Sequence, residues 1–435
     1  MAFSLPEGRT ETSLKDKKPR YSPAEAKAEA DRCLYCADAP CIKACPTSID
    51  IPTFIKQIAS GNVVGSAETI FEQNVLGESC ARVCPVEVLC VGDCVYNGWN
   101  KPPIQIGRLQ RFATETAKAQ GAKIFDKKTH PKPRKVACVG AGPASLGFAA
   151  GMALAGHHAV VFEKRAVPGG LNATGIAPYK LHAHDAVDEV AWVASLGVEI
   201  KTGVEIGKDV TAAQLLNDYD AVYLGVGLGA DSKLGAPGED GPGVHGAVDW
   251  IERMKLGRID VGALGRVIVV GGGNTAIDVA RECALLGAAS VTMAYRRTIA
   301  DMSGYEHEMK GGRLEGVTLV TSAAPTAVER DASGRVTGLK VARTEGGKPL
   351  AGTERVLPCD TIIVAIGQAK LRDVATALGG VELDARGCVV ADPATGATKN
   401  PKVFAGGDCI NGGKEVVNAV ADGRNTARHL IARWA

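Results

Sequence analysis

Residues 135–145 read KVACVGAGPAS, and residues 266–276 read RVIVVGGGNTA. In each stretch an apolar run typical of a buried strand is followed at once by a glycine-rich turn and a helical pattern. A second apolar run completes each unit, at residues 158–163 and at residues 290–295. Such turns let the backbone approach a pyrophosphate, which the helix N-terminus stabilises. The sequence therefore predicts two dinucleotide-binding βαβ units in one α/β chain.

The first turn fits the G-x-G-x-x-(G/A) fingerprint loosely, because Ser145 stands at its third position. Glu163 ends the next predicted strand 21 residues after Gly142, where a carboxylate can accept the hydroxyls of a ribose. The alternative is a glycine-rich turn that only lets a helix pack closely on its strand. The residues of this turn expected to contact the dinucleotide are Gly140, Gly142, Pro143 and Ala144.

The second turn matches the fingerprint cleanly, as Gly271-x-Gly273-x-x-Ala276. No Asp or Glu follows about 20 residues later, where Arg296 and Arg297 stand instead. Guanidinium groups at this point suit a 2′-phosphate, so the pattern favours NADPH. If both arginines are only solvated at a strand end, NADH would serve. The dinucleotide contacts expected in this unit are Gly271, Gly273, Asn274, Thr275, Arg296 and Arg297.

The composition agrees with a multidomain nucleotide-binding protein. The 435 residues include 53 glycines, and aromatic residues make up only 5%. The net charge of +2 gives no strong field for nucleic acid or an anionic membrane, so we expect neither as a partner. The N-terminal residues 1–20 lack the apolar run of a signal peptide, and we therefore expect a cytoplasmic protein.

The cysteines are the second strong signal in the sequence. Eight of the 13 fall within a 62-residue window. In a reducing compartment, such crowding favours metal ligation over disulfides. The runs C-x2-C-x4-C-x3-C-P and C-x3-C-P-x4-C-x3-C resemble ferredoxin spacing in part, and the two Cys-Pro pairs favour two [4Fe-4S] clusters over zinc. The eight are Cys33, Cys36, Cys41, Cys45, Cys80, Cys84, Cys90 and Cys94.

The C-terminal stretch 403–408, VFAGGD, places Asp408 after a strand and a tight turn, before a predicted helix at 415–427. It resembles the second FAD signature of flavoproteins with two dinucleotide domains, in which the Asp binds the ribityl chain. The resemblance implies that the first site holds FAD and that the FAD domain is split in sequence. Residues 361–367, TIIVAIG, resemble the strand that leads back from the nicotinamide domain. A plain loop turn at Asp408 is the alternative.

Taken together, the cysteine spacing and the motifs GAGPAS, GGLN, GGGNTAID, AYRR and VFAGGD resemble one known module across almost the whole chain. This is the NAD(P)H-oxidising FAD and iron–sulfur module shared by glutamate synthase small subunits and dihydropyrimidine dehydrogenases. Residues 104–115, IQIGRLQRFATE, look like the dihydropyrimidine dehydrogenase branch, in which a glutamine completes the second cluster. The resemblance therefore favours that branch and implies the electron-input subunit of a bacterial enzyme.

The resemblance also implies the ligands of each cluster. Cluster 1 takes Cys33, Cys36, Cys41 and Cys94, and cluster 2 takes Cys45, Cys84, Cys90 and Gln110. Counting cysteines alone would use all eight thiols and make Cys80 the last ligand. The two ligand sets conflict at this single position, and we follow the family.

Further family positions imply additional cofactor contacts. Lys180 matches a basic position near the flavin and is a candidate for polarising it, although a plain surface lysine is the alternative. The FAD contacts implied in all are Gly140, Gly142, Pro143, Ala144, Glu163, Gly170, Leu171, Lys180, Gly407 and Asp408. Ala365 and Gly367 are expected to join the NAD(P) site. The expected domains are a helical iron–sulfur domain at 1–125, the first FAD part at 133–245, the NAD(P) domain at 246–365 and the second FAD part at 366–435.

The expected function follows from these cofactors. NAD(P)H would reduce FAD, and two clusters would carry single electrons onward. Long family members contain a flavin-mononucleotide barrel that reduces pyrimidine, and this sequence has none. The resemblance thus implies a separate catalytic subunit with FMN and iron–sulfur clusters, which reduces uracil or thymine to the 5,6-dihydropyrimidine. The alternatives are a glutamate synthase small subunit that serves a glutamate-forming partner, and a non-catalytic redox sensor.

Two further patterns look like sites but are interpreted otherwise. His182 and His184 alternate as metal ligands can, yet they lie beside a helical run and are expected to be packed or solvated. The run Glu306-His307-Glu308 lacks the second histidine of a zinc-protease helix, so we expect an exposed charged face.

Overall fold

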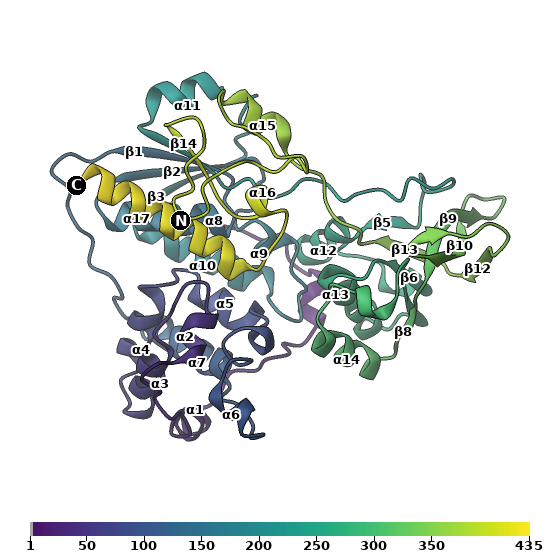
Figure 1. The fold of residues 1–435 in the computed structure, drawn as a ribbon, viewed down its shortest axis with the longest axis horizontal. Coiled ribbons are helices and arrows are strands. Elements are labelled where there is room, and N and C mark those ends of the chain that lie inside the picture. The colour runs from purple at the N-terminus through teal and green to yellow at the C-terminus, as the bar shows by residue number, and fades with distance from the viewer. Residues whose placement is uncertain (1–2) are drawn as a thin grey trace.

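The N-terminal part of the chain is helical, as expected, in the computed structural model, which describes residues 3–435 (Figure 1). The first α-helix begins at Pro23, where the side chains of the N-cap Ser22 and of Glu25 form a reciprocal capping box. The elements are η1 (Thr10–Ser13), α1 (Pro23–Ala30), α2 (Pro40–Ala44), α3 (Ile51–Ala59), α4 (Val63–Phe71), α5 (Gly77–Val83), η2 (Val86–Val88), α6 (Val95–Gly98) and α7 (Ile106–Ala119).

The first α/β part is a five-stranded parallel sheet in the order β14-β4-β1-β2-β3. Its strands are β1 (Lys135–Val139), β2 (His158–Glu163), β3 (Val198–Thr202), β4 (Ala221–Leu224) and β14 (Val403–Ala405). Its helices are α8 (Pro143–Leu154), α9 (Leu171–Thr174), α10 (Ala183–Ser195), α11 (Ala212–Asp218), α15 (Arg372–Ala377), α16 (Asp408–Asn411) and α17 (Val416–Trp434). The edge strand β14 comes from the C-terminal region, so this sheet is built from two separate stretches of sequence.

The second α/β part is also a parallel sheet, in the order β5-β13-β6-β7-β8. Its strands are β5 (Val244–Gly246), β6 (Arg266–Val270), β7 (Ser290–Ala294), β8 (Val317–Val320) and β13 (Thr361–Val364). Its helices are α12 (Ala247–Leu256), η3 (Val261–Ala263), α13 (Asn274–Leu285), η4 (Ile299–Asp301) and α14 (Glu306–Leu314). An antiparallel sheet that the sequence did not indicate is inserted between β8 and β13, made of β9 (Ala323–Arg330), β10 (Val336–Glu345), β11 (Lys348–Pro349) and β12 (Arg355–Pro358).

Helix α17 packs closely on α8 because small residues line the crossing. A Cβ atom at Gly423 would overlap the Ala144 carbonyl oxygen, and one at Gly147 would lie 3.0 Å from the Val420 carbonyl oxygen. A Cβ at Gly151 would lie 2.9 Å from the Cβ of Ala427. This close approach brings the C-terminal segment beside the first glycine turn.

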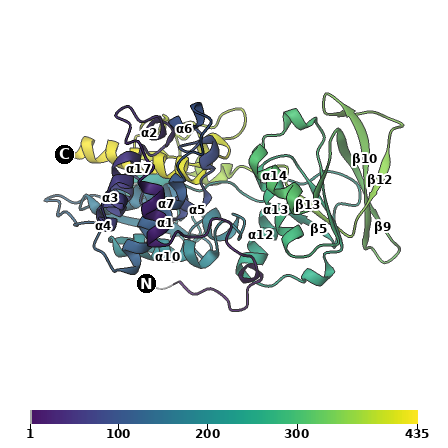
Figure 2. The same ribbon diagram turned by 90° about the horizontal axis from the view of Figure 1, so that it is seen from below.

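The three parts of the chain contact one another, since α12 of the second α/β part also contacts α9 and η1. Helix α17 runs between the first sheet and the N-terminal helices, and the second sheet lies to one side of both (Figures 1 and 2). Both α10 and α17 contact α5 of the N-terminal part. No helix within residues 3–435 combines the length and the apolar character needed to cross a bilayer.

Candidate functional site

The first glycine turn forms a tight backbone cradle. Gly140 has a positive φ of 89° and Gly170 one of 54°. A Cβ at Gly170 would lie only 2.8 Å from the Gly142 Cα, whereas a Cβ at Gly142 would meet nothing closer than 3.9 Å. Gly142 is the N-cap of α8, and Gly170 is the N-cap of α9, which begins at Leu171. Two helix starts and bare backbone thus converge where a pyrophosphate would bind.

Glu163 lies at the turn, as its position in the sequence predicts. Its carboxylate accepts hydrogen bonds from the backbone N–H of Ala141 at 2.8 Å and of Arg165 at 2.9 Å. The residue is buried at the end of β2. The side chain is therefore held in one position beside the cradle, where ribose hydroxyls could reach its remaining lone pairs.

The structure brings the C-terminal motif against this turn. A Cβ at Gly407, whose φ is 76°, would lie 3.0 Å from the Cβ of Ala144. Asp408 begins α16, accepts the Lys414 N–H at 3.0 Å, and has its pKa raised by burial. Asp422, which the sequence analysis missed, accepts the Gly407 N–H at 2.9 Å. No local motif marks Asp422, since its partner lies on another element.

The second turn is covered by a loop that the sequence analysis also missed. Gly273 is the N-cap of α13, and a Cβ there would lie 3.5 Å from the Ser303 Oγ. The Gly304 N–H donates to the Gly272 carbonyl oxygen at 3.0 Å, and the Tyr305 N–H donates to Asn274 Oδ1 at 2.9 Å. The Tyr305 hydroxyl reaches across to Glu415 Oε1 at 2.7 Å. The other predicted contacts lie around the same turn: Thr275 in the first turn of α13, Ala365 directly after β13, and Gly367 two residues further on.

Arg296 and Arg297 follow β7 and are both exposed. Their backbone is fixed, because the Arg296 carbonyl accepts from Thr344 and the Arg297 carbonyl accepts the Ser322 N–H. Within residues 3–435 neither guanidinium forms an ion pair. The two side chains are thus available to an anion, and their role as phosphate contacts stays a prediction.

Lys180 is not a surface lysine. Its ammonium lies 2.8 Å from Asp278 Oδ1 and 3.0 Å from Glu308 Oε1, and its side chain is 16% exposed. Burial lowers its pKa, but the two carboxylates outweigh burial and hold the pKa above the usual value. Our expectation that residues 306–308 form an exposed charged face is wrong for Glu308, which also pairs with Arg281. Lys180 therefore stays charged between the two α/β parts.

Four of the cysteines surround one cavity in the N-terminal part. Cys33, Cys36, Cys41 and Cys94 line it together with apolar side chains. Burial, followed by the nearby Cys33 and Cys94, raises the pKa of the Cys41 thiol to about 12. Neighbouring thiols contribute to the raised pKa of Cys33 and of Cys41, and a metal cluster that binds thiolates removes this penalty by replacing the protons. The set is the one the resemblance assigns to cluster 1.

A second group gathers around Cys90. Burial is the main cause that raises its pKa, followed by the thiols of Cys84, Cys45 and Cys41. Cys84, at the end of α5, has its pKa raised by the Cys80 side chain one turn earlier and by burial. Gln110 on α7 is buried, and its Nε2 donates to the Gly77 carbonyl at 2.7 Å. Cys80 thus lies within α5, and the Gln110 side chain contacts the first residue of that helix. Which of the two completes the cluster stays a prediction.

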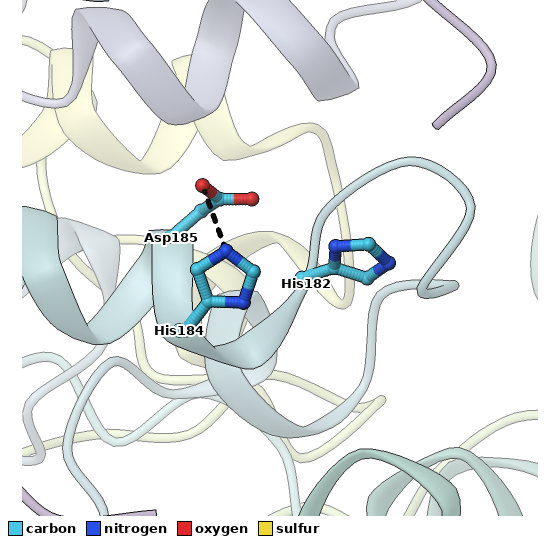
Figure 3. Close-up of side chains that lie close together, drawn as sticks. All are labelled: His182, His184 and Asp185. Carbon is cyan, nitrogen blue, oxygen red and sulfur yellow. Dashed lines mark ion pairs between the residues drawn. The ribbon is translucent and has the colours of Figure 1, made fainter. Parts of the chain in front are cut away.

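Apart from the cysteines, His182, His184 and Asp185 are brought together, with one possible ligand atom of each within 4.8 Å of the others (Figure 3). His182 points away from the pair formed by His184 and Asp185, and its Nε2 lies 3.0 Å from the Leu14 carbonyl. Asp185 accepts from Arg82 at 2.9 Å and lies 3.4 Å from the His184 Nε2. Protein groups thus engage these atoms, and we assign no metal here.

Two family models match the chain. Residues 10–122 match dihydropyrimidine dehydrogenase domain II, 4Fe-4S cluster. Residues 134–423 match pyridine nucleotide-disulphide oxidoreductase. The boundary between the matches falls in the segment that joins α7 to β1.

Curated relatives match nearly the full length. The glutamate synthase (NADPH) small chain of Halomonas elongata is 39% identical, with 94% of this chain and 91% of the relative covered. The NAD-dependent dihydropyrimidine dehydrogenase subunit PreT of Escherichia coli O157:H7 is 37% identical, with 95% of each covered. These identities are too similar to separate the two branches.

Solved structures share the fold at lower identity. A thioredoxin reductase of T. acidophilum is 22% identical with a TM-score of 0.57, covering 69% of this chain and 99% of that one. FprA of Mycobacterium tuberculosis in complex with NADPH is 19% identical with a TM-score of 0.56, covering 70% and 85%. Both likenesses concern the fold alone.

Proposed function

The chain belongs to the family of NAD(P)-dependent flavin and iron–sulfur oxidoreductases that includes dihydropyrimidine dehydrogenase subunits and glutamate synthase small chains. From this membership we propose that it supplies electrons to a pyrimidine-reducing partner. It is an enzyme with a 4Fe-4S domain and an FAD- and NAD(P)-dependent domain. A purely sensory, non-catalytic role does not agree with this membership. The substrate and the partner subunit are proposed beyond this family membership.

The proposed reaction begins at the two dinucleotide turns. Bound FAD can accept a hydride from NAD(P)H and release its electrons singly to two [4Fe-4S] clusters. Glu163 and Asp408 hold the flavin dinucleotide at its ribose and ribityl chain, and Gly273 lets the nicotinamide dinucleotide approach α13. No side chain has to act as nucleophile or general base in this half-reaction. The protein's contribution is position and charge.

Lys180 has a more specific proposed role in the same site. Asp278 and Glu308 belong to the NAD(P) part, while Lys180 belongs to the first FAD part. The ion pairs keep the ammonium protonated and fix the two parts relative to each other. As the family position implies, an ammonium fixed at this interface would polarise a flavin bound there.

The geometry supports an order of electron transfer from cluster 2 to cluster 1. Cys84 ends α5, and α5 is tied to the flavin part because the Glu189 carboxylate on α10 accepts the N–H groups of Glu78 and Ser79 at 3.0 and 3.2 Å. The cavity of Cys33 and Cys94 is instead lined in part by Leu34, an exposed apolar side chain. We therefore place cluster 2 next to the flavin and cluster 1 at the exit toward the partner.

Gln110 is the observation that favours pyrimidine as the final substrate. It is buried on α7, and its Nε2 donates to the Gly77 carbonyl at the start of α5, the helix that ends at Cys84. A glutamine ligand is the family feature that separates the dihydropyrimidine dehydrogenase branch. The proposed partner is a subunit with FMN and iron–sulfur clusters that reduces uracil or thymine. The 39% identity to a glutamate synthase small chain supports the second candidate, a glutamate-forming partner.

Reconstitution tests the two candidates directly. The chain is purified without oxygen and should carry one FAD and about eight iron atoms if both clusters are complete. Alone, it should reduce ferricyanide or a viologen with NAD(P)H but should not reduce uracil. Addition of the FMN-containing dihydropyrimidine dehydrogenase subunit should start uracil reduction. Glutamate formation with a glutamate synthase large subunit, and no uracil reduction, would reverse the choice.

The ligand set has a separate test in two single variants. With Gln110 as ligand, Cys80→Ser keeps both clusters and most dye-linked activity, and Gln110→Ala loses or alters one cluster in electron paramagnetic resonance. The opposite outcome has support in the position of Cys80, whose side chain raises the pKa of Cys84 one turn later on α5. Loss of a cluster in Cys80→Ser with an unaltered spectrum in Gln110→Ala would establish eight cysteine ligands and remove the main support for pyrimidine.

A further inference from the structure

Helix α17 carries two arginines that face the N-terminal part without an acidic partner. Arg424 and Arg428 are one turn apart and both donate to the Gln73 side chain, at 3.1 Å each. Across the described part of the chain, neither guanidinium forms an ion pair. Arg281, which is more deeply buried, pairs with two carboxylates. The two arginines on α17 thus place positive charge against the N-terminal part with no carboxylate paired to it among the described residues.

Arg424 contacts Thr47, which lies two residues after the predicted cluster ligand Cys45 in the sequence. Its guanidinium donates to the Thr47 carbonyl and to the Gln73 carbonyl, the latter at 3.0 Å. Thr47 is fully buried, and its Oγ1 lies 3.3 Å from the Cys45 Sγ. Arg424 therefore fixes the residue whose hydroxyl contacts the sulfur of Cys45.

A nearby anion would stabilise these two arginines. Like charges four residues apart on a helix repel each other, and a partly desolvated guanidinium is costly without a counter-charge. Burial and the neighbouring Arg428 lower the pKa of Arg424 to about 10, while Cys45 acts in the opposite direction. A [4Fe-4S] cluster with thiolate ligands carries net negative charge, and it would supply the missing counter-charge at Cys45.

We propose that Arg424 is a positioning residue that raises the reduction potential of the cluster bound at Cys45, Cys84 and Cys90. It places a positive charge beside that cluster and holds the Thr47 hydroxyl against the Cys45 sulfur; charge and hydrogen bonds to sulfur are two of the factors that set such potentials. Arg428 adds charge from one turn further along α17. The proposal rests on the proposed function, since it requires cluster 2.

The test is a redox titration of the whole protein followed by electron paramagnetic resonance. Arg424→Gln should shift the midpoint potential of cluster 2 downward and change that of cluster 1 less. Arg424→Lys, which keeps the charge, should recover most of the shift. Arg433→Gln is the matched control, because Arg433 is an exposed arginine on the last turn of the same helix. Equal potentials in Arg424→Gln and wild type, or an equal shift in Arg433→Gln, would overturn the proposal.

Two further variants keep the test decisive if Arg424→Gln purifies without cluster 2. Arg428→Gln and Thr47→Val leave Arg424 in place, so a downward shift in either supports the proposal and no shift in both overturns it. Iron content and Cys45→Ser separate this result from the proposed function. If Cys45→Ser keeps both clusters unaltered, the ligand set itself is wrong; if only the potentials fail to move, the role of Arg424 is wrong.

Discussion

The two glycine turns of this chain have the same local design and different surroundings. Both follow a parallel strand, and in each a glycine with an ordinary negative φ is the N-cap of the next helix, Gly142 in the first turn and Gly273 in the second. The first turn is enclosed by the buried Glu163 carboxylate and by the C-terminal segment at Gly407. The second turn is covered by the loop at residues 303–305 and by the Tyr295 ring beside Gly272, and two exposed arginines follow its second strand.

This difference teaches that the turn specifies where a dinucleotide lies but not which one. A carboxylate after the second strand accepts ribose hydroxyls, whereas guanidinium groups at the same place suit a phosphate. These groups also differ in accessibility, because Glu163 is buried and both arginines are exposed. A buried contact suits a cofactor that stays bound, and an exposed contact suits one that exchanges in each turnover.

The largest expected effect comes from Gly142→Val. A Cβ at residue 142 meets no atom closer than 3.9 Å, so the fold should tolerate the change, but the added side chain fills the cradle where the pyrophosphate must lie. We expect FAD to be lost on purification, with FAD affinity reduced more than about a hundredfold, or ~3 kcal/mol. Flavin absorbance and iron content after anaerobic purification measure this. A variant that retains full FAD would show that the first turn does not bind the flavin.

The matched change in the second turn is Gly273→Val. Its nearest neighbour is the Ser303 Oγ at 3.5 Å, and residue 273 is likewise a helix N-cap, so the local cost is comparable. This variant should keep FAD and iron, while the concentration of NAD(P)H needed for half-maximal flavin reduction rises at least about tenfold, or ~1.4 kcal/mol. Stopped-flow reduction of the flavin is the measurement. Loss of FAD here, rather than in Gly142→Val, would exchange the two assignments.

Neutralisation of both arginines sharpens the choice between nicotinamide cofactors. In the double variant Arg296→Gln and Arg297→Gln, the ratio of kcat/KM for NADPH to that for NADH should fall about tenfold. The estimate stays near ~1.4 kcal/mol because exposed charges contribute little each. Dye-linked assays with each cofactor provide the ratio. A wild-type protein that already prefers NADH would remove the arginines as phosphate contacts.

The smallest expected effect comes from Tyr305→Phe, which removes the bond between the loop over the second turn and Glu415. One hydrogen bond contributes about 0.5–1.5 kcal/mol net, so the KM for NAD(P)H should rise by a few fold with FAD content unchanged. Steady-state kinetics and flavin absorbance check both parts. An unchanged KM would mean that the loop does not need this bond to cover the turn.

Much of the fold could be predicted because its signals are local. The strands β1, β2 and β6 begin and end where their apolar runs do, and Ser22 begins α1 as its capping box predicts. The helix expected at 415–427 continues to Trp434, since buried Leu430 extends its apolar face. Local patterns carry this information because a strand, a turn and a cap are each decided within a few residues.

The missed parts of the site depend on contacts between distant residues. Asp422 matters because it accepts the N–H of Gly407 from another element, and Tyr305 because it reaches Glu415. Lys180 resembled a surface lysine as much as a buried one, because its partners Asp278 and Glu308 lie about a hundred residues away in the sequence. Charge pairs of this kind leave no spacing pattern in a single sequence.

The edge position of β14 has a consequence for biosynthesis. The second sheet is contiguous in sequence and can fold as soon as β13 leaves the ribosome, whereas the first sheet must wait for Val403–Ala405 and for α17 to close on α8. At roughly 5–20 residues per second, β14 is made on the order of ten seconds or more after β4. The nascent chain therefore passes through a stage with an open sheet edge and no place for flavin, and chaperones or a riboflavin shortage should act on the protein at that stage.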